Sequence, residues 1–207
     1  MSYTLPTNAG QLLGLGNKME SGLVELGVAL DITQITAAEF QTYLTAFSNA
    51  DNAFNAGRSA RQTASDIYQA ALVAMDDWLA VTKGVLLGRF GYRWTTEWAQ
   101  AGFINYTTQL PRKIEDRIAL TGRLAAFFTK NPSYEVPNMK VTAAQAAAVQ
   151  STVLAKQLGL TNSTRGLAVL SEAWTGAFEA LTNEMWLLIR ILQATLGASD
   201  PDRKSVV

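Results

Sequence analysis

The feature that most constrains the fold is an uninterrupted seven-residue repeat of apolar side chains in the second half of the chain. The repeat consists of Ala146, Val153, Leu160, Leu167, Trp174, Leu181 and Leu188. Such a repeat is typical of a long helix with one apolar edge. Because no proline lies between Pro137 and Pro201, we expect residues 141–197 to form one long helical arm.

The first half of the chain contains a similar arm over residues 35–91. Its apolar repeat consists of Phe40, Phe47, Phe54, Tyr68 and Met75, with leucines four positions after several of them. Each arm begins with a short echo of the other, Ile35-Thr36-Ala37-Ala38 and Val141-Thr142-Ala143-Ala144, and each ends on a glycine. The threonines are predicted helix N-caps. The pattern indicates arms of matched length, and the identities between them are too sparse to establish a duplication.

Each arm has a weak midpoint. Residues 55–57 and 159–164 are poor helix formers at matching places. Because the heptad phase continues across both midpoints, we favour two continuous helices, with a hairpin of shorter helices as the alternative.

The remaining segments are shorter. Residues 1–34 are predicted to form an N-terminal helical arm, and residues 92–140 a bridge with short helices and an extended crossover from Ser133 to Lys140. Thr95 is expected to cap one bridge helix over Glu97 to Ala101, and another is expected to hold Pro111 in its first turn and stop at Asn131-Pro132. Residues 198–207 read as a polar tail. The predicted fold is therefore all-α: an elongated antiparallel helical bundle with two long heptad-patterned arms and a short helical bridge region.

Composition excludes several kinds of chemistry. The chain has no histidine and no cysteine, which removes disulfides, imidazole and thiolate metal ligands, and nucleophiles activated by histidine. Basic and acidic residues balance at 17 each, so no overall field attracts nucleic acid. We expect no cofactor, no metal site, no membrane span and no enzymatic activity. A cytoplasmic location is the default expectation, since the first residues do not resemble a signal peptide.

The densest aromatic group lies after the first arm and is interleaved with arginines. Its candidate interaction residues are Arg89, Tyr92, Arg93, Trp94, Trp98 and Phe103, within a cluster that extends to Tyr106. Such a group could bind a ligand or peptide through stacking and cation–π contacts. Trp94 and Trp98 would share a helix face if the short bridge helix reached back to Trp94. The simpler interpretation is that the rings seal the core where the first arm ends.

The charged run from Pro111 to Arg117 has two interpretations. Arg112 and Asp116 are four residues apart, so the run is explained most simply as a solvated helix face with intrahelical ion pairs. An anion-binding role for Arg112, Lys113 and Arg117 is the alternative.

The second arm contains the best local indication of a partner. Its stretch from Met185 to Leu192 is apolar on almost every side, with Arg190 as its one charge, and includes the candidate interaction residues Trp186 and Ile189. A helix that is apolar all round must be buried all round. Charged residues are also scarce, at 16% of the chain against roughly 25% in ordinary soluble domains. We therefore expect a homo-oligomer, with an unidentified protein partner as a further option.

Four segments carry a resemblance to a known family. They are Ile35-Thr36-Ala37-Ala38-Glu39-Phe40, Phe90-Gly91-Tyr92-Arg93-Trp94, Pro111 to Leu120, and Asn131-Pro132-Ser133-Tyr134-Glu135-Val136-Pro137. Together they resemble a family of uncharacterised bacterial helical proteins, over roughly residues 35 to 201. The resemblance implies a bacterial origin and a two-armed fold, and it implies no catalytic residue and no ligand.

These observations lead to a functional expectation. The chain is predicted to be a non-enzymatic structural or scaffolding protein that self-associates. The alternative is a ligand- or peptide-binding module that uses the cluster from Arg89 to Tyr106.

Overall fold

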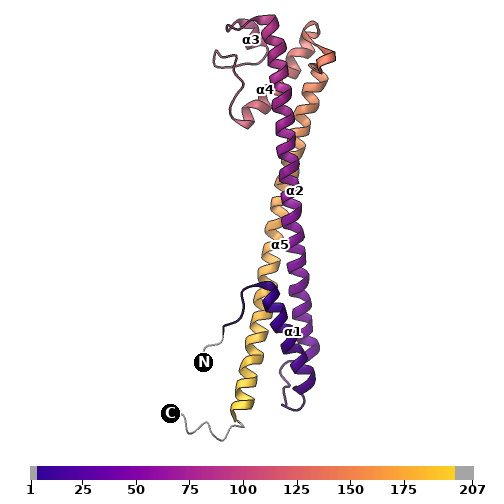
Figure 1. Cartoon of the computed structure of the whole chain (residues 1–207), viewed down its shortest axis with the longest axis vertical. Coiled ribbons are helices and arrows are strands. Elements are labelled where there is room, and N and C mark those ends of the chain that lie inside the picture. The colour runs from indigo at the N-terminus through magenta and orange to yellow at the C-terminus, as the bar shows by residue number, and fades with distance from the viewer. Residues whose placement is uncertain (1–3, 199–207) are drawn as a thin grey trace. The chain divides into compact units, whose positions relative to one another are not determined.

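The computed structural model describes residues 4–198, and the regular structure in this part of the chain is helical (Figure 1). In chain order the elements are α1 (Ala9–Leu26), α2 (Ala37–Phe90), α3 (Thr96–Gln100), α4 (Ile114–Lys130), the short 3-10 turns η1 (Pro132–Tyr134) and η2 (Pro137–Met139), and α5 (Ala143–Ala198). The predicted all-α fold, with two long helices that pack against each other and shorter helices between them, is confirmed.

Both long helices are continuous through their weak midpoints. Helix α2 has 54 residues and α5 has 56, and the residues at both midpoints are helical. The preference for two continuous helices is therefore confirmed over the hairpin alternative. Gly57 has a packing role in the first midpoint, because a Cβ atom there would lie 2.6 Å from Cδ1 of Leu170. Tertiary contact between the two helices thus offsets a weak local propensity.

The echoed threonines are the caps of these helices. The backbone N–H of Glu39 donates to the Thr36 hydroxyl at 3.2 Å, and the Glu39 carboxylate accepts from the backbone N–H of Thr36 at 2.9 Å. This reciprocal pair is a capping box. At the second helix the N–H of Gln145 donates to the Thr142 hydroxyl at 3.1 Å. The echo between the arms is therefore a repeated helix start.

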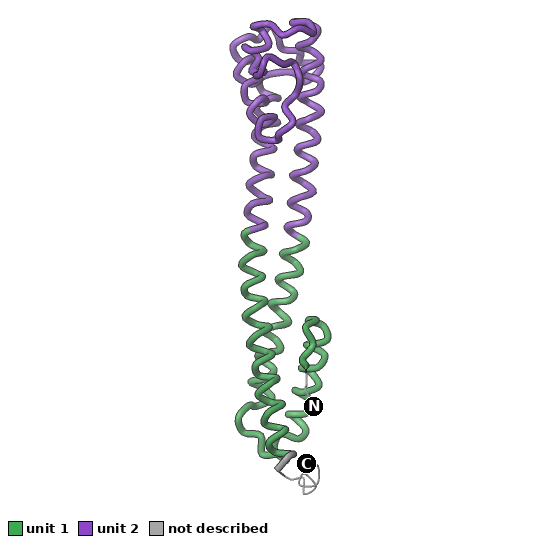
Figure 2. Tube along the Cα trace, turned by 90° about the vertical axis from the view of Figure 1, so that its left-hand side faces the viewer, with its two compact units in different colours: residues 1–59, 165–207 green, residues 60–164 purple. Residues whose placement is uncertain are grey.

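The chain divides into two compact units (Figure 2). Unit 1 consists of Met1–Ser59 and Arg165–Val207, and unit 2 of Ala60–Thr164. Both boundaries fall inside the long helices, directly beside the weak midpoints. Each unit has its own apolar core.

In unit 1, helix α1 packs on the adjoining parts of α2 and α5. The core consists of Leu12, Leu23, Ile35, Phe40, Leu44, Phe47, Leu181, Met185 and Leu188. Phe47 contacts Phe178, with ring centroids 5.8 Å apart, whereas Gly57 lies against Leu170. Partners of later α2 residues therefore come earlier in α5, so the two helices are antiparallel in this unit. The residues of this unit that hold the predicted heptad positions are buried or half-buried.

In unit 2, α3 and α4 pack with the second half of α2 and the first half of α5. Buried members of this core include Tyr68, Met75, Leu79, Leu86, Trp98, Leu120, Leu124, Phe128, Ala146 and Val153. Helix α4 is tied to its neighbours by an ion pair between Arg117 and Asp76 of α2 and by a 3.3 Å hydrogen bond from Gln150 of α5 to the Ile118 carbonyl. The heptad residues of the sequence again supply the core.

Three details of the bridge differ from the sequence-based expectation. Helix α4 begins at Ile114, so Pro111 and Arg112 precede it, and the expected pair of Arg112 with Asp116 on one helix face does not form. The stretch from Ser133 to Lys140, expected to be extended, is largely the turns η1 and η2, each with a proline at its start. A proline fixes φ near the value that such a turn requires.

The polar tail expected over 198–207 lies, beyond Ala198, outside the described residues.

Candidate functional site

The aromatic–arginine cluster divides into a buried part and an exposed part. Trp98 is fully buried, and Phe103 is 4% exposed. The Trp98 ring meets Phe103 edge-on at 4.8 Å and Phe90 at 5.5 Å, and its indole Nε1 donates to the Gly91 carbonyl at 3.2 Å. These contacts place both residues in the core of unit 2, where they seal the end of α2.

The other members of the cluster are at the surface. Arg89 and Arg93 are exposed, and Tyr92 is 85% exposed. Trp94 is half-buried and meets the ring of Tyr106 at 5.8 Å. Helix α3 begins only at Thr96 and does not reach back to Trp94, so the condition under which Trp94 and Trp98 would share a helix face is not met. The structure therefore does not bring the six candidate residues together in one site.

The apolar end of α5 is covered on one side within its own chain. Met185 and Leu188 are buried in the core of unit 1, to which α1 contributes Leu12 and Leu23. Trp186 and Ile189 are half-buried on the flanks of the same helix, and neighbouring Leu187 is 38% exposed. Helix α1 thus provides part of the burial that we expect for this apolar stretch, and Trp186 and Ile189 remain partly exposed.

A second surface, which has no charged side chain and which the sequence analysis did not single out, lies on α5 in unit 2. We call it the uncharged face; it consists of Ala144, Ala147, Ala148, Ser151, Leu154, Ala155, Leu158, Gly159, Thr161 and Asn162, all of them exposed. Leu154 is 46% exposed and Leu158 is 60% exposed. Exposed helix faces are usually charged or polar, so this face is unusual for a surface in water.

The polar side chains of the uncharged face are partly satisfied by their own helix. The Ser151 hydroxyl donates to the Ala148 carbonyl at 3.0 Å, and the Thr161 hydroxyl donates to the Gln157 carbonyl at 3.0 Å. Hydroxyls bonded in this way need fewer bonds to water than free ones.

The sequence signal for this face was available, because Lys156 is the only charged residue between Lys140 and Arg165.

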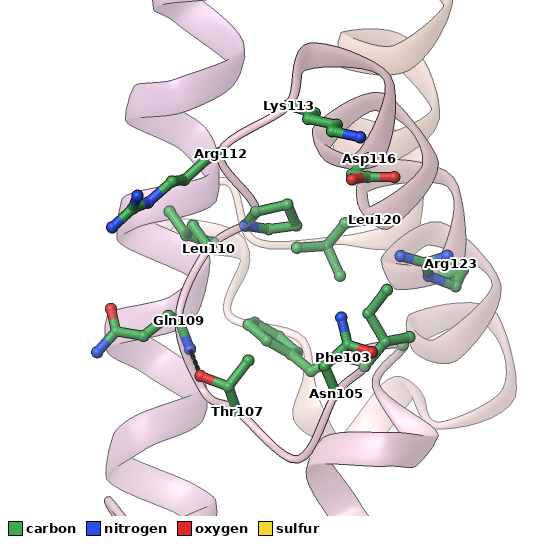
Figure 3. A pocket seen from close by; sticks show the side chains of 13 residues that line it. Phe103, Asn105, Thr107, Gln109, Leu110, Arg112, Lys113, Asp116, Leu120 and Arg123 are labelled. Atoms are coloured by element: carbon green, nitrogen blue, oxygen red, sulfur yellow. Dashed lines mark hydrogen bonds between the residues drawn. The ribbon is translucent and has the colours of Figure 1, made fainter.

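Unit 2 also contains a pocket of about 270 Å³ between the loop that follows α3 and the first turns of α4 (Figure 3). Its apolar wall includes Phe103, Leu110, Pro111 and Leu120. Its polar lining includes Asn105, Lys113, Asp116 and Arg123. In Figure 3, Lys113, Asp116 and Arg123 lie on one side of the pocket, whereas Arg112 points away from them.

The loop that forms this pocket has an uncommon backbone. Asn105 and Tyr106 have positive φ values of 61° and 55°, and Gly102 has a φ of 94°. Gly102 is required there, because a Cβ atom on it would lie 2.4 Å from Cβ of Arg123. Arg123 therefore packs directly on the loop backbone. Its Nε atom is buried and has no hydrogen-bond partner in the described part of the chain.

Comparison of the chain with models of protein families, with curated proteins and with solved structures found no match. Within residues 4–198, no helix is both long and apolar enough to cross a membrane.

Proposed function

We propose that this protein is a non-enzymatic structural or scaffolding protein that self-associates through the uncharged face of α5. The observation that carries the proposal is the exposure of Leu154 and Leu158 on a helix face without a charged side chain. Transfer of these leucines from water into an interface is favourable at about 25 cal/mol per Å² of apolar area.

A second copy of the chain is the occupant that this face fits best. A face without charge can meet its own copy about a two-fold axis without repulsion between like charges. Its alanine, serine and glycine side chains are small, so a second helix can approach closely, and its two leucines can pack into the gaps between them. The leucines are four residues apart, on one side of the helix.

Single-cysteine variants test the proposal, because the natural chain has no cysteine. The variants Ser151→Cys, Leu154→Cys and Leu158→Cys lie on the face, and Lys156→Cys is the matched control on the flank of the same helix. In a two-fold interface the residue nearest the axis meets its own copy, and a disulfide requires Cα atoms within about 7 Å.

We expect mild oxidation to convert at least one of the three face variants into a covalent dimer at micromolar protein concentration, while Lys156→Cys stays largely monomeric. If the control cross-links as fast as every face variant, or if no face variant cross-links, self-association through this face is wrong.

The alternative function is ligand or peptide binding by the cluster from Arg89 to Tyr106. It has less support, because Trp98 and Phe103 are held in the core, and the exposed members Arg89, Tyr92, Arg93 and Tyr106 are left without them. It predicts that Tyr92→Ala abolishes binding without a loss of stability, whereas Trp98→Ala lowers stability in either case.

A further inference from the structure

We propose that the pocket between the loop after α3 and the start of α4 binds a small carboxylate with an apolar body. This proposal does not depend on self-association. The shape of the site comes from residues on one compact unit, and its chemistry from an apolar wall next to two cationic side chains.

The apolar wall determines the body of the ligand. Leu120 is fully buried, Phe103 is 4% exposed, and half-buried Leu110 and Pro111 line the same pocket. A volume of about 270 Å³ lies just below the usual range of ligand pockets, roughly 300–1,000 Å³. The occupant is therefore smaller than a typical drug molecule.

The charged side of the pocket determines the polar group of the ligand. Lys113 and Arg123 lie beside Asp116 there, which leaves one excess positive charge once Arg112, which points away, is set aside. Within residues 4–198 the one ion pair is that of Arg117 with Asp76, so neither Lys113 nor Arg123 forms a direct ion pair with Asp116 or another described carboxylate. A single carboxylate matches this excess, whereas a doubly charged phosphate would exceed it.

Arg123 is the cation that the loop holds in place. Its Nε atom is buried against Gly102 without a hydrogen bond among the described residues, so a ligand in the pocket would meet the terminal nitrogens of the guanidinium. Its stem is held on Gly102, which keeps the guanidinium at the pocket wall. A planar guanidinium pairs well with a carboxylate.

The test is a titration of the full chain with hexanoate, followed by the ¹⁵N–¹H NMR signals of Ile104, Asn105 and Thr107. Hexanol and hexylamine, which have a similar apolar body, serve as the uncharged and cationic control ligands. We expect saturable shifts with hexanoate, and binding weaker by about tenfold or more for the other two probes, as expected for loss of a charge-assisted contact.

Variants separate the roles of the cations. Arg123→Gln and Lys113→Gln should each weaken hexanoate binding by about fivefold or more, whereas Arg112→Gln should change it by less than about twofold. If Arg123→Gln fails to fold because it packs on the loop, exposed Lys113 still provides the test. Equal binding of hexanoate and hexanol, no saturable shift up to about 20 mM, or equal loss in Arg112→Gln and Lys113→Gln would overturn the proposal.

Discussion

The indole Nε1 of Trp174 donates a 2.9 Å hydrogen bond to the carboxylate of Asp51, which joins α5 to α2 within unit 1. The same ring stacks on Phe178 at 5.2 Å and meets Phe47 at 5.6 Å. Trp174 therefore serves both as a heptad residue of the apolar edge and as a polar link that helps to set the register of the two helices.

The first prediction separates these two roles. Trp174→Phe retains a ring but removes the hydrogen-bond donor. We expect the loss of this hydrogen bond to lower the free energy of unfolding by about 0.5–1.5 kcal/mol. This is less than the usual value for a hydrogen bond to a charged acceptor, because Asp51 is partly exposed. Urea denaturation measures the change. In Asp51→Ala the Trp174→Phe substitution should cost clearly less; an equal cost in both backgrounds would show that the hydrogen bond contributes nothing.

The second prediction concerns two glycines in opposite settings. Gly166 is inside α5, and a Cβ atom there meets nothing within 4 Å, so Gly166→Ala should stabilise by about 0.5–1 kcal/mol through helix propensity. Gly102 has a φ of 94° and lies under Arg123, so Gly102→Ala should destabilise by about 1–3 kcal/mol. Thermal unfolding of both variants checks the opposite signs, and the same sign in both would contradict the described loop.

The third prediction concerns pH and the capping box of α2. The backbone N–H of Thr36, and then its hydroxyl, hold the pKa of the Glu39 carboxyl below its usual value. A carboxyl with a lowered pKa in the folded state contributes stability above its unfolded pKa of about 4.3, and this contribution is lost as the pH falls through the folded pKa.

The comparison is between the natural chain and Glu39→Gln, which cannot ionise. Any advantage of the natural chain in urea denaturation should be constant above about pH 6 and should shrink as the pH falls below the unfolded pKa of about 4.3. An advantage that grows with acidity would contradict the capping role of the carboxylate.

Much of the fold was predictable because its signals are local or periodic. The heptad residues from Ala146 to Leu188 mark the edge of α5 that packs on α2, and Thr36 and Thr142 mark the helix starts. Continuity through Gly57 was harder to predict, since the contact of Gly57 with Leu170 joins residues far apart in the sequence.

The candidate sites were less predictable for the same reason. The division of the aromatic cluster depends on where α3 starts and on Phe90 and Phe127, whose rings lie 6.2 Å apart although they are distant in the chain. The shape of the pocket depends on the positive φ values of Asn105 and Tyr106. A positive φ is uncommon for tyrosine, so no residue pattern predicts one at Tyr106. The uncharged face was visible in the sequence, but its exposure depends on which edge of α5 the other helices cover.

The most direct test of the central claim is sedimentation equilibrium of the natural chain beside two variants of matched exposure. Leu158 on the uncharged face and Val73 on α2 are both 60% exposed. At about 100 µM we expect the natural chain and Val73→Glu to sediment as the same oligomer and Leu158→Glu to sediment as a monomer, because the introduced carboxylate would be buried at the interface. A monomeric natural chain, or a Leu158→Glu variant that associates as the natural chain does, would contradict self-association through this face.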